Sequence, residues 1–161
     1  MIAPVTLWID PGGQTGLGIY FAHNGIFEAS EHPFFEACSR IEEACYRWMG
    51  TLAIGWERYT PRRDKPQTHA ADALTVIGVA RYVSLKHRCL VLPEADPMSP
   101  KTADRLLLTS LGWWVPGKDD AQSAANHMLK WMLRSGNLPP DVATRMSVQA
   151  GTVSGRRRTG S

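Results

Sequence analysis

The feature that most constrains the fold of this chain is an apolar stretch near its start that runs into an acidic residue and a glycine-rich turn. The stretch reads LWIDPGGQTGLG from Leu7 to Gly18. Beyond the turn, apolar residues alternate with other residues through Phe21, as they do in a β-strand. We therefore expect Asp10 to lie at a strand end, where a sheet opens to solvent and a carboxylate can bind a metal ion.

Length and composition indicate one domain. The chain has 161 residues, 43% hydrophobic and 20% charged, which allows one substantial core and is too short for two ordinary domains. We assign residues 1–136 to this domain and residues 137–161 to a C-terminal extension that ends in a disordered basic tail. The 3 cysteines lack the CxxC spacing of a zinc site. We expect neither a signal peptide nor a membrane span, and hence a cytoplasmic protein.

The order of predicted elements indicates an α/β fold. Strands over residues 5–9, 16–21 and 26–30 are joined by short turns and form an antiparallel meander. A helix from Phe34 to Gly50 then supplies the crossover that lets the strand over 51–59 pair parallel with the first strand. A helix over 68–85, a strand over 89–92 and helices over 102–111 and 119–134 follow. The sequence thus predicts a mixed five-stranded sheet flanked by helices.

Acidic residues from three separate elements meet at one end of this predicted sheet. Asp10 ends the first strand, Glu57 lies near the end of its parallel neighbour, and Asp119 and Asp120 open the last helix. Clustered carboxylates repel one another unless a cation lies among them, and Mg²⁺ prefers oxygen ligands that it shares with phosphate. Two such ions about 3.5–4 Å apart can activate water for attack on a phosphodiester. The pattern predicts a metal-dependent nuclease.

The same motifs resemble those of RuvC-type Holliday junction resolvases, in particular the compact versions found in phages, and the order of elements is similar to the RNase H-like fold of the retroviral integrase superfamily. The resemblance covers residues 5–134 and is carried by the Leu7–Gly18 stretch, by GWERY at Gly55–Tyr59 and by DDAQSAANH at Asp119–His127. It implies a crossover junction endonuclease of bacterial or phage-infected cells that uses two Mg²⁺ ions, with Mn²⁺ possible. Because a four-way junction has two-fold symmetry, we expect a C2 homodimer, with the second helix at its surface.

The closing helix departs from the family pattern, which usually carries Asp-x-x-Asp. The position three before Asp120 is Gly117. Asp119 and Asp120 are about 100° apart on a helix, so they cannot point equally well into one site. We favour Asp120 as the third metal ligand beside Asp10 and Glu57. Asp119 is then a second candidate ligand or a helix N-cap.

Other residues are weaker candidates with ordinary alternatives. His127, two turns along the face of Asp120, is a metal ligand, an activator of water or a packed helical histidine. Lys118 and Lys101 contact phosphates near the site or are surface lysines. Tyr59 stacks on bases of an opened junction, as the resemblance implies, or is a core residue at a strand end. A basic loop supplies three further DNA contacts, namely Arg62, Arg63 and Lys65.

Two other functions share part of this pattern. The phosphate loop of sugar-kinase or actin-like ATPases also places Asp-x-Gly after a first strand, but that fold needs two such domains and this chain has one copy of the motif. A non-catalytic DNA-binding module would keep the RNase H-like fold without its chemistry. Branched DNA is the expected partner in either RNase H-like case.

Overall fold

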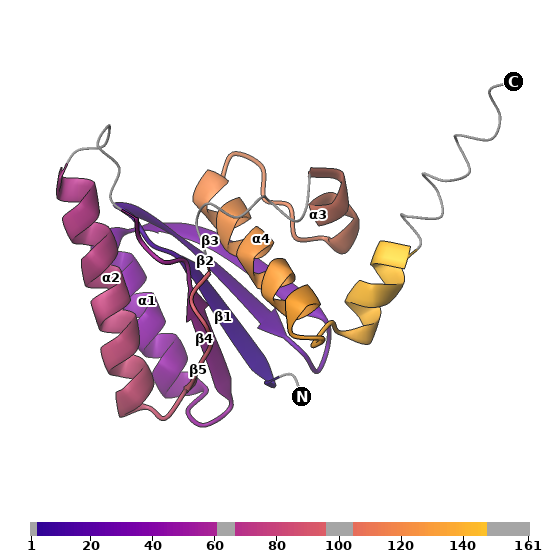
Figure 1. The fold of residues 1–161 in the computed structure, drawn as a ribbon, viewed down its shortest axis with the longest axis horizontal. Coiled ribbons are helices and arrows are strands. Elements are labelled where there is room, and N and C mark those ends of the chain that lie inside the picture. The colour runs from indigo at the N-terminus through magenta and orange to yellow at the C-terminus, as the bar shows by residue number, and fades with distance from the viewer. Residues whose placement is uncertain (1–2, 61–66, 96–104, 148–161) are drawn as a thin grey trace, which may run out of the picture.

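The computed structural model describes residues 3–60, 67–95 and 105–147. Within these ranges a five-stranded sheet lies between two layers of helices (Figure 1). Its strand order is β3-β2-β1-β4-β5. The elements, in chain order, are β1 (Val5–Asp10), β2 (Gln14–Phe21), β3 (Ile26–Pro33), α1 (Phe34–Arg47), β4 (Leu52–Trp56), α2 (Gln67–Lys86), β5 (Leu90–Val91), α3 (Arg105–Leu111) and α4 (Asp119–Arg134).

The predicted meander and crossover are confirmed. Strand β1 pairs antiparallel with β2, which pairs antiparallel with β3, and on its other side β1 pairs parallel with β4. Strand β2 begins two residues earlier than predicted, at Gln14. Strand β4 ends at Trp56 rather than Tyr59, because beyond it the chain forms only a single bridge, from Glu57 to Ala95.

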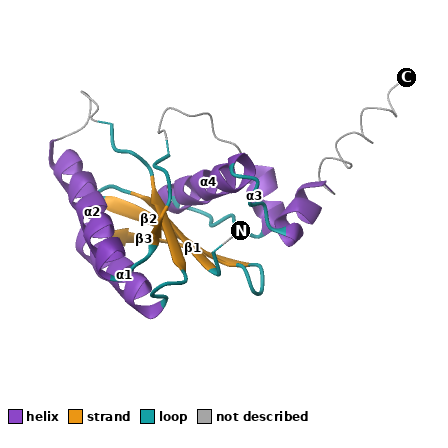
Figure 2. Ribbon diagram, turned by 60° about the horizontal axis from the view of Figure 1, so that its bottom comes forward, coloured by secondary structure: helices purple, strands orange, loops and turns teal. Residues whose placement is uncertain are grey.

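Each face of the sheet carries its own core, as Figure 2 shows with helices on both sides. Leu7 and Ile9 pack with α1 and α2 in one cluster, whereas Trp8 packs with α4 and α3 in the other. This alternation follows from the two-residue period of a strand, and it explains why β1 is buried on both faces from Val5 to Ile9. By the same period, Asp10 lies on the face that α4 covers.

The chain beyond α4 packs against the second cluster. Residues 140–147 are helical, Val142 is buried, and the Tyr20 hydroxyl donates to Asp141 at 3.0 Å. Arg145 donates to the Leu111 carbonyl at 2.9 Å. The core therefore continues past residue 136. The predicted division there stays a prediction, and the predicted basic tail lies outside the described residues.

Two glycines of β2 let α4 lie close to the sheet. A Cβ atom added at Gly16 would overlap the backbone of Asp120 and lie 2.8 Å from the Ala121 nitrogen. A Cβ atom at Gly18 would meet the Phe27 ring at 3.0 Å and the Ala124 Cβ at 3.7 Å. These glycines lie within the strand rather than in the turn. Their role is to bring the first turn of α4 against β2.

We predict that Gly16→Ala destabilises the protein by about 1–3 kcal/mol or more, because the added methyl group must push α4 away from β2. Gly78→Ala is the matched control, since no atom of the described ranges lies within 4 Å of a Cβ atom at that exposed helix position. It should stabilise α2 by up to about 1 kcal/mol. Urea unfolding followed by circular dichroism measures both values. Equal stability of the Gly16→Ala variant and the wild type would contradict the close contact.

Candidate active site

The three predicted carboxylates lie near one another at the carboxyl end of β1. Asp10 is the last residue of β1, and the Glu57 amide donates to the Ile9 carbonyl at 3.0 Å, so Glu57 lies beside it just beyond β4. The Asp10 and Glu57 carboxyl groups share a hydrogen bond, and the Ser123 hydroxyl donates to Asp10 from α4. Asp120, in the first turn of α4, is close enough for its charge to act on Asp10.

Electrostatics mark Asp10 as the centre of this cluster. Burial, followed by the charge of Glu57 and its hydrogen bond, raises the pKa of Asp10 from 3.8 to about 8. The charge of Asp120 adds to this rise, and the Ser123 hydroxyl opposes it. A carboxyl group in such surroundings either holds a proton or needs a nearby cation.

His127 belongs to the same cluster. Its Nε2 atom lies 2.9 Å from a carboxylate oxygen of Glu57, and the two side chains are 11% and 16% exposed. The His127 Nδ1 atom is buried and has no hydrogen-bond partner among the residues that the structure describes. The histidine therefore packs inside the site and bonds to one of the predicted metal ligands.

The donor set suits a hard divalent cation. Asp10, Glu57 and Asp120 offer carboxylate oxygens, the ligands that Mg²⁺ prefers, and their mutual repulsion is what a cation would relieve. Among the described residues, however, no three His, Cys, Asp or Glu side chains are spaced to hold a metal ion together. The Glu57 carboxylate contacts both Asp10 and His127.

The first turn of α4 distinguishes the two adjacent aspartates. Asp119 is exposed, whereas Asp120 is half-buried and close enough for its charge to raise the pKa of Asp10. The N-cap residue of α4 is Lys118, and no side chain caps the helix from that position. The N-cap interpretation of Asp119 is therefore wrong, because Asp119 is already inside the helix. Lys118 is itself exposed and lies 3.9 Å from Glu31.

Two residues near the site were missed by the sequence reasoning. Ser123 lies one turn after Asp120, at the position where an Asp-x-x-Asp motif counted forward from Asp120 would place its second acid. Counting three residues forward from Asp120, as well as three back, would have identified Ser123 from the sequence. Glu31 of β3 accepts hydrogen bonds from the first turn of α4. No local pattern identifies it, since it lies 89 residues from Asp120 in the chain.

The predicted DNA contacts are only partly visible. Tyr59 is partly buried and packs against the core cluster that α1 and α2 cover. This packing agrees with the strand-end core interpretation. The other predicted contacts fall outside the described residues, namely Arg62, Arg63, Lys65 and Lys101.

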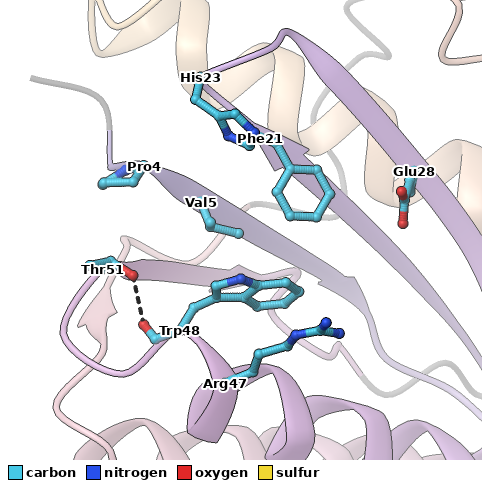
Figure 3. A pocket seen from close by; sticks show the side chains of 8 residues that line it. All are labelled: Pro4, Val5, Phe21, His23, Glu28, Arg47, Trp48 and Thr51. Carbon is cyan, nitrogen blue, oxygen red and sulfur yellow. Dashed lines mark hydrogen bonds between the residues drawn. The ribbon is translucent and has the colours of Figure 1, made fainter.

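A pocket of about 560 Å³ lies at the opposite end of the sheet (Figure 3). It is lined by the start of β1, the end of β2 and the segment between α1 and β4, where the Thr51 hydroxyl donates to the Trp48 carbonyl at 3.0 Å. Val5 and Asp10 are the two ends of β1, so this pocket is separate from the carboxylate cluster.

The solved structures similar to this one include two of Thermus thermophilus RuvC. One is Thermus thermophilus RuvC in complex with a Holliday junction substrate, with a TM-score of 0.61 and 17% identity over 82% of this chain and 96% of that chain. The chain has the RuvC fold. A second Thermus thermophilus RuvC structure has a TM-score of 0.58 and 18% identity over the same shares.

The RNase H-like α/β fold predicted from the sequence is thus confirmed. No protein-family model matches the chain, and no curated protein matches it. None of the helices within the described ranges has the length and hydropathy needed to cross a bilayer.

The raised pKa of Asp10 predicts how metal-free stability depends on pH. Between its unfolded value near 3.8 and its folded value of about 8, the folded protein binds more protons than the unfolded chain, so stability falls as pH rises. Asp10→Asn removes this titration. We therefore expect the variant to gain a few degrees in melting temperature at about pH 8, and less at about pH 5.

Thermal unfolding in EDTA, followed by circular dichroism, measures both gains. Asp119→Asn is the matched control, because it removes the same charge from an exposed neighbour. It should shift the melting temperature by the same small amount at both pH values. Equal gains for Asp10→Asn at the two pH values would contradict the burial and repulsion described above.

Proposed function

We propose that this protein is a metal-dependent endonuclease that cleaves branched DNA, with the four-way junction as its preferred substrate. The observation that carries the proposal is the cluster of Asp10, Glu57 and Asp120 at the carboxyl end of two adjacent parallel strands of a RuvC fold. Hydrolysis of a phosphodiester requires metal ions and an attacking water molecule beside the phosphate. A carboxylate cluster at the end of a sheet can bind those ions where the phosphate has access.

The roles of the residues follow from their positions. Asp10, Glu57 and Asp120 would hold Mg²⁺, or Mn²⁺ in its place, with two ions per site and Asp119 as a weaker candidate. When bound, the metal ions supply Lewis-acid activation of the phosphate and of the attacking water. The Ser123 hydroxyl orients the Asp10 carboxylate, and Nε2 of His127 holds Glu57. Lys118, at the exposed start of α4, is suited to contact a phosphate.

The proposed partner is branched DNA. RuvC from Thermus thermophilus, which has a similar fold, was solved in complex with a Holliday junction substrate, and we extend that substrate class to this chain. Five residues are proposed to contact the DNA backbone or bases, namely Tyr59, Arg62, Arg63, Lys65 and Lys101. Contacts between basic side chains and phosphates provide a large share of the affinity for DNA and make that affinity dependent on salt. The compact phage type of resolvase and a cytoplasmic location remain part of this proposal.

A homodimer would match the two-fold symmetry of a four-way junction. Along α2, Leu74, Tyr82 and Leu85 are 57%, 64% and 78% exposed. They follow helical spacing and form one stripe on the outside of the molecule. We propose this stripe as the dimer surface.

The wild-type protein should nick a synthetic four-way junction when Mg²⁺ is present and not in EDTA. Asp10→Asn and Glu57→Gln should each lower the cleavage rate by more than about 100-fold, since even partners of metal ligands typically account for 10–100-fold. Glu28→Gln is the control and should cleave as the wild type does, because Glu28 is an exposed acid that lines the pocket at the opposite end of the sheet. Gel analysis of labelled junctions, flaps and linear duplexes gives the rates and the substrate preference.

The same assay separates the competing functions. Undiminished cleavage by Asp10→Asn would refute the assignment of the site. Junction binding by the wild type without cleavage in Mg²⁺ or Mn²⁺ would favour the non-catalytic DNA-binding module. Binding of ATP in equilibrium dialysis, with no affinity for DNA, would favour the ATPase-like alternative.

The dimer surface predicts a change in mass. Sedimentation of the wild type should give the mass of two chains, and Tyr82→Glu should give the mass of one, because a charge in an apolar interface is costly to bury. Tyr46→Glu is the matched control, since Tyr46 is 68% exposed on the neighbouring helix α1. It should remain dimeric. A wild-type protein that is monomeric at tens of micromolar would contradict the proposed surface.

A further inference from the structure

Glu31 connects the edge of the sheet to the helix that carries Asp120. It lies on β3, and its Oε1 atom accepts hydrogen bonds from the backbone N–H groups of Asp120 at 2.8 Å and Ala121 at 3.3 Å. Its Oε2 atom lies 3.9 Å from Lys118 Nζ. The Glu31 side chain is 14% exposed. A carboxylate thus meets two of the four amides that the start of a helix leaves without partners inside the helix.

The strand register places Glu31 in line with the site. Asp10 pairs with Gly16 between β1 and β2, and Gly16 pairs with Glu31 between β2 and β3. Directly paired residues present their side chains on the same face of a sheet, so these three form a row beneath the first turn of α4. The turn lies over Gly16, where a Cβ atom would overlap the Asp120 backbone. Glu31 therefore holds this turn on the side away from Asp10.

We propose that Glu31 is a positioning residue of the candidate metal site, which fixes the first turn of α4 and so sets where the Asp120 carboxylate lies relative to Asp10. The proposal rests on the proposed function, in which Asp120 is a metal ligand. Glu31 acts through backbone amides and is not itself a ligand. Helix α4 has no side-chain cap of its own, since Lys118 at the N-cap position makes no such bond. The cap comes instead from a strand 89 residues earlier.

Glu31 also carries a negative charge, and charge alone would attract a cation. The two effects separate by side-chain chemistry. Glu31→Gln removes the charge and keeps an oxygen that accepts from both amides. Glu31→Asp keeps the charge but is one methylene shorter and no longer reaches them. Glu31→Ala removes both. Glu28→Gln is the matched control, because Glu28 is an exposed acid of the same strand that lines the distant pocket.

Two measurements on the full chain test the proposal. Isothermal titration calorimetry with Mn²⁺, which takes the same oxygen ligands as Mg²⁺, gives the affinity of the site. Amide hydrogen exchange, followed by NMR, reports directly on the Asp120 and Ala121 N–H groups. We expect Glu31→Ala and Glu31→Asp to lower the Mn²⁺ affinity about 10–100-fold and to speed exchange at both amides. Glu31→Gln should lose less, and Glu28→Gln should match the wild type.

The outcomes distinguish this proposal from the proposed function. If Asp10→Asn abolishes Mn²⁺ binding while all Glu31 variants bind as the wild type does, Glu31 has no positioning role and the proposed function stands. If Glu31→Asp matches the wild type and Glu31→Gln matches Glu31→Ala, charge rather than position is responsible and the proposal is overturned. If the wild type binds no Mn²⁺, the proposed function fails and this proposal fails with it. Thermal unfolding of each variant shows that the comparison is between folded proteins.

Discussion

The close contact between α4 and β2 is the constraint on which the rest of this site depends. A helix normally packs on a sheet through side chains from both partners, which keep the two backbones apart. Here Gly16 supplies no side chain, so the backbone of Asp120 lies directly over the strand. Asp10, paired with Gly16, is then next to the helix rather than separated from it by a layer of side chains. The TGLG stretch thus determines how near the last acidic residue can approach the first.

This contact concentrates negative charge, and the structure holds the charge in place from several directions. Burial and two neighbouring carboxylates raise the pKa of Asp10 to about 8, while the Ser123 hydroxyl favours the ionised form. His127 pairs with Glu57, and Glu31 binds the first backbone amides of α4. These partners come from a strand at the sheet edge and from the helix above it. The site is consequently a property of the packed sheet and helix, and no single segment contains it.

The two ends of the sheet differ in chemistry for a topological reason. Strands β1 and β4 are parallel, so their carboxyl ends meet at one edge and bring Asp10 and Glu57 together. Their amino ends meet at the other edge, beside the end of α1, and form the pocket that includes Val5 and Trp48. The proposed site at the first edge agrees with the general preference of open α/β sheets for sites beyond the carboxyl ends of strands. The RuvC fold shares this arrangement of strands.

The sequence by itself determined the order of elements, the parallel pairing of β1 with β4 and the carboxylates that meet at their ends. These features depend on local patterns, namely apolar periodicity, turn residues and an acid at a strand end, and on the rule that parallel strands need a crossover. The sequence also favoured Asp120 over Asp119, from the faces of the last helix. Only the tertiary structure decided that His127 bonds Glu57, and that Ser123 and Glu31 support the cluster. Those contacts join residues from 70 positions apart, for Glu57 and His127, to 113 positions apart, for Asp10 and Ser123, and they depend on the height and rotation of α4 over Gly16. Local periodicity predicts which face of a helix is apolar, but it does not predict the distance between the helix and the sheet. Here the short distance between α4 and β2 is what brings Asp120 and Ser123 close to Asp10.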